Sequence, residues 1–210
     1  MSYLKSQDTY PKITKFLKQI IVGKILGDGH LEKNGTHSYR LKIEHSIAQK
    51  DYVDWCYEHL KYFCSQPPKT RLHKDSRGKI CEKYTFQTRS FENFKFFADQ
   101  FYSDGKKTIP RRIIQKLLTP LSIAVWFMDD GSVKSKNTNG RILNTQGFSR
   151  TEVEKLCQAL NAKFDLHAQL RKQKEGWQIF IPAEDALAFY QLLSENILSC
   201  FSYKLPQIKK

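Results

Sequence analysis

Two aspartates that each end an apolar stretch and directly precede a glycine are the residues best placed to do chemistry. Asp28 ends the run IIVGKILGD, and Asp130 ends the run LSIAVWFMDD about 100 residues later. Apolar segments of this length that stop at glycine predict buried helices. A carboxylate at a helix C-terminus is repelled by the unpaired carbonyls there. Two such carboxylates therefore call for a cation, and oxygen ligands are what a hard divalent ion such as Mg²⁺ binds.

Either motif alone is equally well explained as an ordinary Asp-Gly turn after a core helix. The interpretation as a metal site therefore depends on the presence of both motifs in one chain. Residues 21–29 and 123–131 resemble the two copies of the nine-residue signature of the LAGLIDADG homing endonucleases. Residues 106–110, 118–120, 143–146 and 203–206 extend this resemblance to single-chain, two-motif members of the family. The resemblance covers nearly the whole chain and is closest in the second half.

The fold that this resemblance implies is α/β (α+β), with two pseudo-symmetric αββαββα repeats and saddle-shaped antiparallel DNA-binding sheets. Residues 1–112 would form the first repeat with a basic N-terminal lead-in, and residues 113–210 the second. The two motif helices would pack at a pseudo-twofold axis. Gly23 and Gly27 are one turn apart and supply small residues for that contact. Lys24 is expected to point away from it, toward solvent or DNA.

Hydrophobic periodicity predicts the elements between the motifs. We expect helices over residues 13–28, 50–63, 91–101 and 121–131, another from residue 149, and a last one over 183–198. We expect strands over residues 38–45, 69–74, 81–88, 141–146, 168–172 and 177–181, with a polar loop after Gly131. Local similarity pairs Arg40 with Arg141 and His45 with Gln146.

The resemblance also implies an active site. Asp28 and Asp130 would ligate Mg²⁺, with the main-chain carbonyls of Gly27 and Asp129 nearby. The Asp129 carboxylate could equally be an N-cap or a solvated side chain. We expect Mn²⁺ to substitute for Mg²⁺, and Ca²⁺ to support binding without cleavage.

Three further residues complete the implied catalytic set. Lys107 and Lys204 match basic positions of the family and would polarise water or stabilise phosphate charge, with a solvated surface lysine as the alternative. Gln146 would orient water.

Composition favours a polyanionic partner. The chain of 210 residues has 35 Lys and Arg against 21 Asp and Glu, a net charge of +14, and the charge is spread along the sequence. No segment approaches the apolar length of a membrane span, so we expect no membrane association. Double-stranded DNA is the expected partner, and we expect a monomer without an obligate protein partner.

Five cysteines without a C-x-x-C pair favour a reducing compartment. The first ten residues lack signal- and transit-peptide patterns. We expect an organelle interior, a mitochondrion that encodes the protein, with chloroplast, cytoplasm or nucleus as alternatives.

Polar faces of the predicted strands and their flanking loops would contact DNA. The candidates are Lys33, Arg40, Lys42, Glu44, His45, Arg71, His73, Lys74, Lys83, Thr85, Gln87, Lys134, Arg141, Gln169, Arg171, Gln173 and Gln178. For each one, a solvated strand face is an equally good explanation.

These features together predict a site-specific homing endonuclease that hydrolyses both strands of a long DNA target at two divalent-metal sites. An intron RNA maturase on the same fold is the alternative from another class. A transcription regulator would usually need an added helix-turn-helix domain, for which the chain leaves no room.

Overall fold

The computed structural model describes residues 11–75, 78–110, 114–135 and 137–207. The first half contains α1 (Lys15–Leu26), β1 (His30–Lys33), β2 (Tyr39–Ser46), α2 (Lys50–Leu60), β3 (Lys69–Lys74), β4 (Ile80–Gln87) and α3 (Lys95–Phe101). The second half contains α5 (Pro120–Asp130), β7 (Gly131–Ser135), β8 (Thr138–Leu143), α6 (Arg150–Phe164), β9 (Gln169–Gln173), β10 (Gly176–Ile181) and α7 (Ala186–Leu193). Between them lie β5 (Tyr102–Ser103), β6 (Lys106–Lys107) and α4 (Ile114–Leu117), and the 3₁₀ segment η5 (Ser199–Lys204) lies near the C-terminus.

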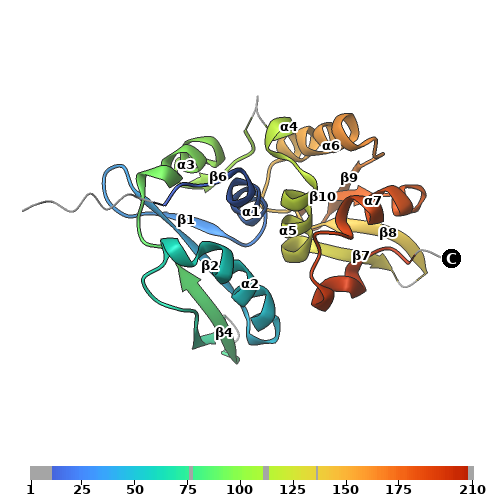
Figure 1. Cartoon of the computed structure of the whole chain (residues 1–210). Helices are drawn as coiled ribbons and strands as arrows, with labels where there is room; N and C mark the ends of the chain where they lie inside the picture. The colour runs from blue at the N-terminus through green and yellow to red at the C-terminus, as the bar shows by residue number, and fades with distance from the viewer. Residues whose placement is uncertain (1–10, 76–77, 111–113, 136, 208–210) are drawn as a thin grey trace, which may run out of the picture.

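The two halves have the same sheet topology. One antiparallel sheet has the order β1-β2-β4-β3, and the other has the order β7-β8-β10-β9. Figure 1 shows α1 and α5 next to each other at the centre, with the first half on one side and the second half on the other. The predicted duplication of a mixed α/β unit with antiparallel sheets is thus confirmed. The boundary predicted between residues 112 and 113 lies outside the described residues.

The strands that follow each motif helix differ from the prediction. The polar loop expected after Gly131 is the strand β7, and its counterpart β1 was not predicted either. The strand predicted over residues 141–146 is β8, which ends at Leu143. Gly131 pairs with Leu143 and Ser135 pairs with Thr138, with a register shift between Val133 and Ser135. That irregularity is not visible in the alternation of residue types. The predicted strand begins and ends three residues later than β8.

Both motif helices begin at a capped N-terminus. Thr14 precedes α1, and its hydroxyl accepts a hydrogen bond from the backbone N–H of Leu17 at 3.2 Å. Thr119 and Ser122 form a reciprocal capping box at the start of α5, where Pro120 occupies the first turn. These caps satisfy N–H groups that a helix end would otherwise leave unpaired. They also fix where each helix begins, and therefore which turn reaches the other helix.

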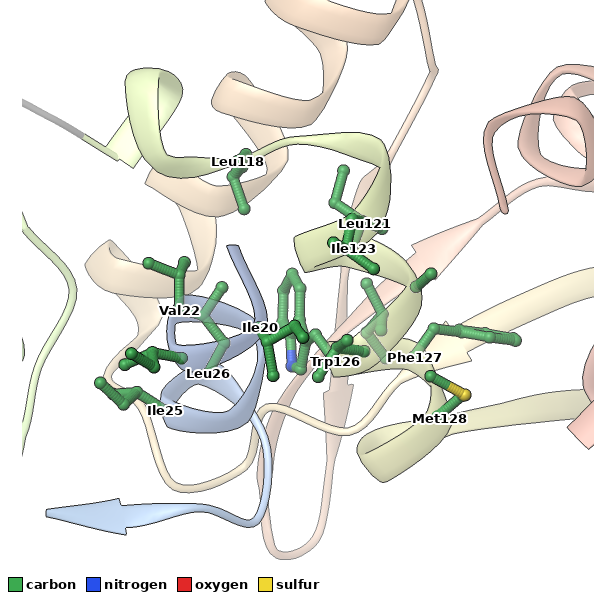
Figure 2. Packing of buried hydrophobic residues seen from close by; sticks show 14 of the residues in the cluster. Ile20, Val22, Ile25, Leu26, Leu118, Leu121, Ile123, Trp126, Phe127 and Met128 are labelled. Carbon is green, nitrogen blue, oxygen red and sulfur yellow. The ribbon is translucent and has the colours of Figure 1, made fainter. Parts of the chain in front are cut away.

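The contact between α1 and α5 is close and almost entirely apolar. Residues 121–128 of α5 are all buried, as expected for a helix that is covered on every side. Figure 2 shows Ile20 of α1 beside Trp126, with Phe127 and Met128 on the far side of α5. A Cβ on Gly23 would lie 2.5 Å from the Ser122 carbonyl oxygen, and a Cβ on Gly27 would lie 2.6 Å from the Asp129 Cβ. The prediction that these two glycines face the other motif helix is confirmed.

We expect Gly23→Ala to lower the free energy of unfolding by about 2 kcal/mol. Alanine favours a helix over glycine by about 1 kcal/mol, but the added methyl group meets a backbone carbonyl that cannot rotate away. Urea denaturation would measure the change. Gly147→Ala is the control, because nothing lies within 4 Å of a Cβ at that position. Equal stability of the two variants would contradict the close contact.

Candidate active site

The two motif helices end differently, although both lead into an aspartate. α1 stops at Leu26, and the N–H of Gly27 caps it by donating to the Gly23 carbonyl at 3.0 Å. Asp28 therefore lies outside the helix, with about half of its side chain exposed. Asp130 is the last residue of α5 and is only partly exposed. The Asp28 side chain thus extends from backbone outside a helix, whereas the Asp130 side chain extends from the last residue of a helix.

Asp129 is the residue that joins the two halves at this point. Its side chain is fully buried, and its Oδ2 accepts a hydrogen bond from the backbone N–H of Asp28 at 2.9 Å. Its Oδ1 accepts hydrogen bonds from Lys24 Nζ and Tyr52 OH, each at 2.8 Å. Because both oxygens accept hydrogen bonds from these donors, the side chain is neither an N-cap nor a solvated group. Its predicted place beside a metal ion stays a prediction.

Lys24 is also placed differently from the prediction. Its side chain is fully buried in the contact between the helices, where its ammonium pairs with Asp129 and lies 4.8 Å from the centre of the Tyr52 ring. The expectation that it points to solvent or DNA is wrong. A buried ammonium needs a charge partner and hydrogen-bond acceptors, and here the acceptors come from Asp129 and His45.

His45 completes this buried group. Only 4% of the residue is exposed, which leaves little of it to contact DNA, and the predicted contact stays a prediction. Burial, and secondly the charge of Lys24, lowers the pKa of His45 to about 3. The ring is therefore neutral at neutral pH, with Nε2 accepting from Lys24 Nζ at 2.8 Å and Nδ1 donating to Gln49 Oε1 at 3.1 Å.

Asp28, His45 and Asp129 have the residue types of a metal site, and one possible ligand atom from each lies within 4.8 Å of the others. The Lys24 ammonium already supplies the cation between His45 and Asp129. Asp28 is the member of this group whose carboxylate remains open, since His45 Nδ1 stays 3.8 Å from its Oδ2.

The two predicted lysines converge on the ends of the motif helices. Lys107 Nζ donates to the Gly27 carbonyl at 2.6 Å, and Lys204 Nζ donates to the Met128 carbonyl at 2.7 Å. Burial lowers the pKa of both ammonium groups, against the opposing effect of the nearby aspartates. A cation at the negative end of a helix is favourable. Lys107 thus contacts the residue before Asp28, and Lys204 contacts the second residue before Asp130.

Asp130 lies where a further cation would be favoured. Burial, and then the charges of Asp28 and Asp129, raises the pKa of its carboxyl to about 7. Within the described residues no side chain donates a hydrogen bond to the carboxylate of Asp28 or Asp130. Two open carboxylates that repel each other, beside two backbone carbonyls, are a donor set that fits a hard divalent cation.

The profile of the LAGLIDADG DNA endonuclease family matches residues 18–189, which include both motif helices. The chain belongs to this family. The probable intron-encoded endonuclease 1 of Wickerhamomyces canadensis is 30% identical over 198 residues, which cover 92% of this chain and 85% of the relative. The cytochrome b mRNA maturase bI2 of Saccharomyces cerevisiae is 31% identical over 201 residues, covering 89% of this chain and 46% of that protein. The structure of the homing endonuclease I-WcaI bound to its DNA recognition sequence superposes with a TM-score of 0.89 at 28% identity, covering 95% of this chain and 90% of that one.

In this LAGLIDADG protein, Asn144 lies where Gln146 was expected. The backbone N–H and the side-chain amide of Asn144 donate to the Asp130 carbonyl at 3.0 and 2.7 Å. Gln178 Nε2 in turn donates to Asn144 Oδ1 at 2.7 Å. Gln146 lies in the turn after β8, and its predicted role stays a prediction without a described contact to Asp130. The true end of β8 at Leu143 is the signal that would have identified Asn144.

The polar face of the first sheet carries most of the predicted DNA contacts. Arg40, Lys42 and Glu44 alternate with buried residues on β2. The strand register places Gln87, Thr85 and Lys83 beside them on β4, and Arg71 beside Lys83 on β3. A groove of about 390 Å³ follows this face, and its lining includes Arg40, Lys42, Lys69, Arg71 and Gln87.

Several candidates on this sheet are limited by existing contacts. Thr85 is buried, and its hydroxyl donates to the Ile43 carbonyl at 2.9 Å, although the residue also lines the groove. Its predicted DNA contact stays a prediction. Glu44 is paired with Arg71 at 3.1 Å. Lys33 and Lys74 are exposed at strand ends, and alternation places Lys74 on the reverse face from His73.

The second sheet presents amides and few cations. Gln169, Arg171 and Gln173 share one face of β9, and Gln178 of β10 is paired with Arg171 in register. Lys134 lies in β7, with its ammonium 4.4 Å from the centre of the Phe180 ring. Gln178 is only 8% exposed and donates a hydrogen bond to Asn144, which limits its contact with DNA, and the predicted contact stays a prediction.

Arg141 is the largest correction. In the second sheet Leu143 pairs with Gly131, and in the first sheet the register of β1 with β2 extends to place Ile43 opposite Gly29. Ile43 and Leu143 are therefore equivalent positions. Two residues earlier, Arg141 corresponds to the buried Leu41 and not to Arg40. A shift of one residue moves a side chain to the other face of a strand. The guanidinium is buried and donates to the carbonyls of Lys204, at 2.6 Å, and Leu205. The predicted pairing of Arg141 with Arg40 is therefore wrong, and little of Arg141 is exposed for the predicted DNA contact.

We expect Arg141→Met to lower the free energy of unfolding by about 2 kcal/mol, because two buried carbonyls lose a charged donor. Arg171→Met is the control and should stay within about 0.5 kcal/mol of the wild type. Urea denaturation of both variants would measure the difference. If Arg141→Met were as stable as Arg171→Met, the buried anchoring role of Arg141 would be refuted.

Proposed function

We propose that this chain is a site-specific homing endonuclease that hydrolyses both strands of a long double-stranded DNA target. The observation that supports this most is the arrangement at the helix ends: two open carboxylates, Asp28 and Asp130, accompanied by the half-buried Lys107 and the buried Lys204. The membership of the LAGLIDADG DNA endonuclease family agrees with it. One aspartate from each half would serve one DNA strand.

We propose that Asp28 and Asp130, with nearby backbone carbonyls, hold Mg²⁺, and that Mn²⁺ can replace it. A divalent ion bound there would activate water and stabilise the charge that develops on the phosphate and on the leaving oxygen. Lys107 and Lys204 place positive charge at the same helix ends, where they would stabilise an incoming phosphate. Asn144 fixes the Asp130 carbonyl through two hydrogen bonds and so fixes the direction of its side chain.

The two sheets would bind DNA with their polar faces. The net charge of +14 attracts the phosphate backbone, and Arg40, Lys42, Lys69, Arg71 and Lys83 lie on the polar face of the first sheet. The remaining glutamines and Arg171 of the second sheet suit adenine and guanine edges. Because the two faces differ in sequence, the target would be asymmetric, and one chain would suffice without a partner subunit.

An RNA maturase activity is the second candidate. A relative that is 31% identical to this chain is named a cytochrome b mRNA maturase. The same basic surface would bind structured RNA, and that activity would not need Asp28 or Asp130. The mutations below separate the two activities.

We place the protein in the organelle whose genome encodes it, a mitochondrion. The intron-encoded endonuclease and the cytochrome b maturase among its relatives support this location. Within the described residues, no helix combines the length and the apolar character that crossing a bilayer requires.

We expect Asp28→Asn and Asp130→Asn each to abolish double-strand cleavage while leaving DNA binding within about threefold of the wild type. Each amide has the shape of the carboxylate but cannot hold a divalent ion as well. Gel assays on the cleaved target would measure nicking and cutting. Asp99→Asn is the control, since that carboxylate makes an exposed ion pair with Lys95. Full double-strand cleavage by either active-site variant would refute the site.

Removal of divalent ions with EDTA should stop cleavage, and addition of Mg²⁺ should restore it. Ca²⁺ should support binding without cutting, because it accepts the same oxygen ligands but takes more of them with looser geometry. A randomised duplex library incubated with each ion would also reveal the target sequence and its overhang. Discrete cleavage in EDTA would exclude the proposed metal dependence, and RNA binding without any DNA cleavage in Mg²⁺ would favour the maturase.

A further inference from the structure

Asp129 belongs to the second motif, yet all three groups that donate to its carboxylate belong to the first half of the chain. They are the ammonium of Lys24, the hydroxyl of Tyr52 and the backbone N–H of Asp28. The Tyr52 hydroxyl is also 3.2 Å from the Val125 carbonyl oxygen. One side chain of α5 therefore fixes the backbone beside the opposite active-site aspartate.

This arrangement exists once and not twice. The position in the first motif that matches Asp129 is Gly27, which has no side chain. A Cβ at Gly27 would lie 2.6 Å from the Asp129 Cβ, so the glycine makes room for the carboxylate. The second motif thus supplies a carboxylate next to Asp28, whereas the first motif supplies no corresponding carboxylate next to Asp130.

The two active-site aspartates need such support to different degrees. Asp28 follows the end of α1, so its backbone lies outside the helical hydrogen-bond pattern. The bond from its N–H to Asp129 Oδ2 is a charge-assisted hydrogen bond in a buried place, which is the stronger kind. Asp130 is inside the last turn of α5, and Asn144 holds its carbonyl.

We propose that Asp129 is a positioning residue for the Asp28 site alone. Its carboxylate accepts the Asp28 N–H, fixes the direction in which the Asp28 side chain leaves the backbone, and contacts neither DNA nor metal. The inference rests on the proposed nuclease function. Its consequence is that loss of this acceptor slows cleavage of one DNA strand and leaves the other unchanged.

The test uses two double variants that differ only in the acceptor. Replacement of Asp129 alone would leave the Lys24 ammonium buried without its partner, which is costly for folding. Both variants therefore also contain Lys24→Met, which keeps the aliphatic length and removes the charge. Lys24→Met/Asp129→Asn, the acceptor-retaining variant, keeps an oxygen that can accept the Asp28 N–H. Lys24→Met/Asp129→Leu, the acceptor-free variant, has a side chain of similar shape without that oxygen.

Cleavage of each strand is followed on the selected target with both strands end-labelled. The nicks left by Asp28→Asn and Asp130→Asn identify which strand each site cuts. We expect the acceptor-free variant to cut the Asp28-dependent strand about tenfold more slowly than the acceptor-retaining variant, because its Asp28 N–H is left without an acceptor. The Asp130-dependent strand should be cut at similar rates by both.

If the acceptor-free variant cuts both DNA strands more slowly by the same factor, Asp129 acts only on the packing of the helices. If it cuts neither strand more slowly, the hydrogen bond to the Asp28 N–H is dispensable. Either result overturns the inference. If the wild type cuts neither strand, the proposed function itself fails.

A measurement on the wild-type protein covers the case in which the acceptor-free variant does not fold. The Asp28 amide should be protected from hydrogen exchange in NMR spectra, although it lies outside the helix next to an exposed side chain. Exchange of this amide at the rate of a free peptide would overturn the inference.

Discussion

The ion pair between Lys24 and Asp129 is the interaction on which the geometry of the helix contact depends. Both side chains are fully buried, and each would be very unfavourable there without the other. Gly23 and Gly27 allow the helices to approach closely enough for the pair to form. A displacement of one helix along the other by one residue would leave both charges buried and unpaired. The pair therefore acts less as a source of stability than as a constraint on register, and that register sets where Asp28 and Asp130 lie.

On this shared framework the two halves have diverged chemically. Asp28 is half exposed and lies near the neutral ring of His45, whereas Asp130 is more enclosed and lies beside the amide of Asn144. The first sheet presents a basic face, and the second presents mainly amides together with the apolar Phe180. A duplicated fold thus places the two proposed sites in different surroundings, which would suit a target whose two halves differ.

The sequence was sufficient to find the residues whose positions depend on local structure. Asp28 and Asp130 could be recognised because the pattern that marks them, an apolar helix followed by Asp-Gly, lies in one continuous segment of the sequence. Lys107 and Lys204 could be found from their flanking residues, and the structure does bring them to the two helix ends. The burial of Lys24 could not be predicted, because it depends on a carboxylate 105 residues away in the chain. Arg141 was misassigned for a related reason: the segment that begins at Arg141 alternates acceptably in two registers, and only pairing with β7 and β10 decides between them.

The buried Arg141 also explains how two different chain segments deliver an equivalent lysine. In the first half, Lys107 lies on the short β5-β6 pair, which places its ammonium against the Gly27 carbonyl. The second half has no matching hairpin among its described residues, and its lysine lies at the end of η5 instead. There, Arg141 donates to the carbonyls of Lys204 and Leu205 and ties that segment to β8. The same position holds Leu41 in the first half, where no such anchor is required. An arginine that sequence similarity assigned to DNA contact thus ties the segment that contains the second lysine to β8.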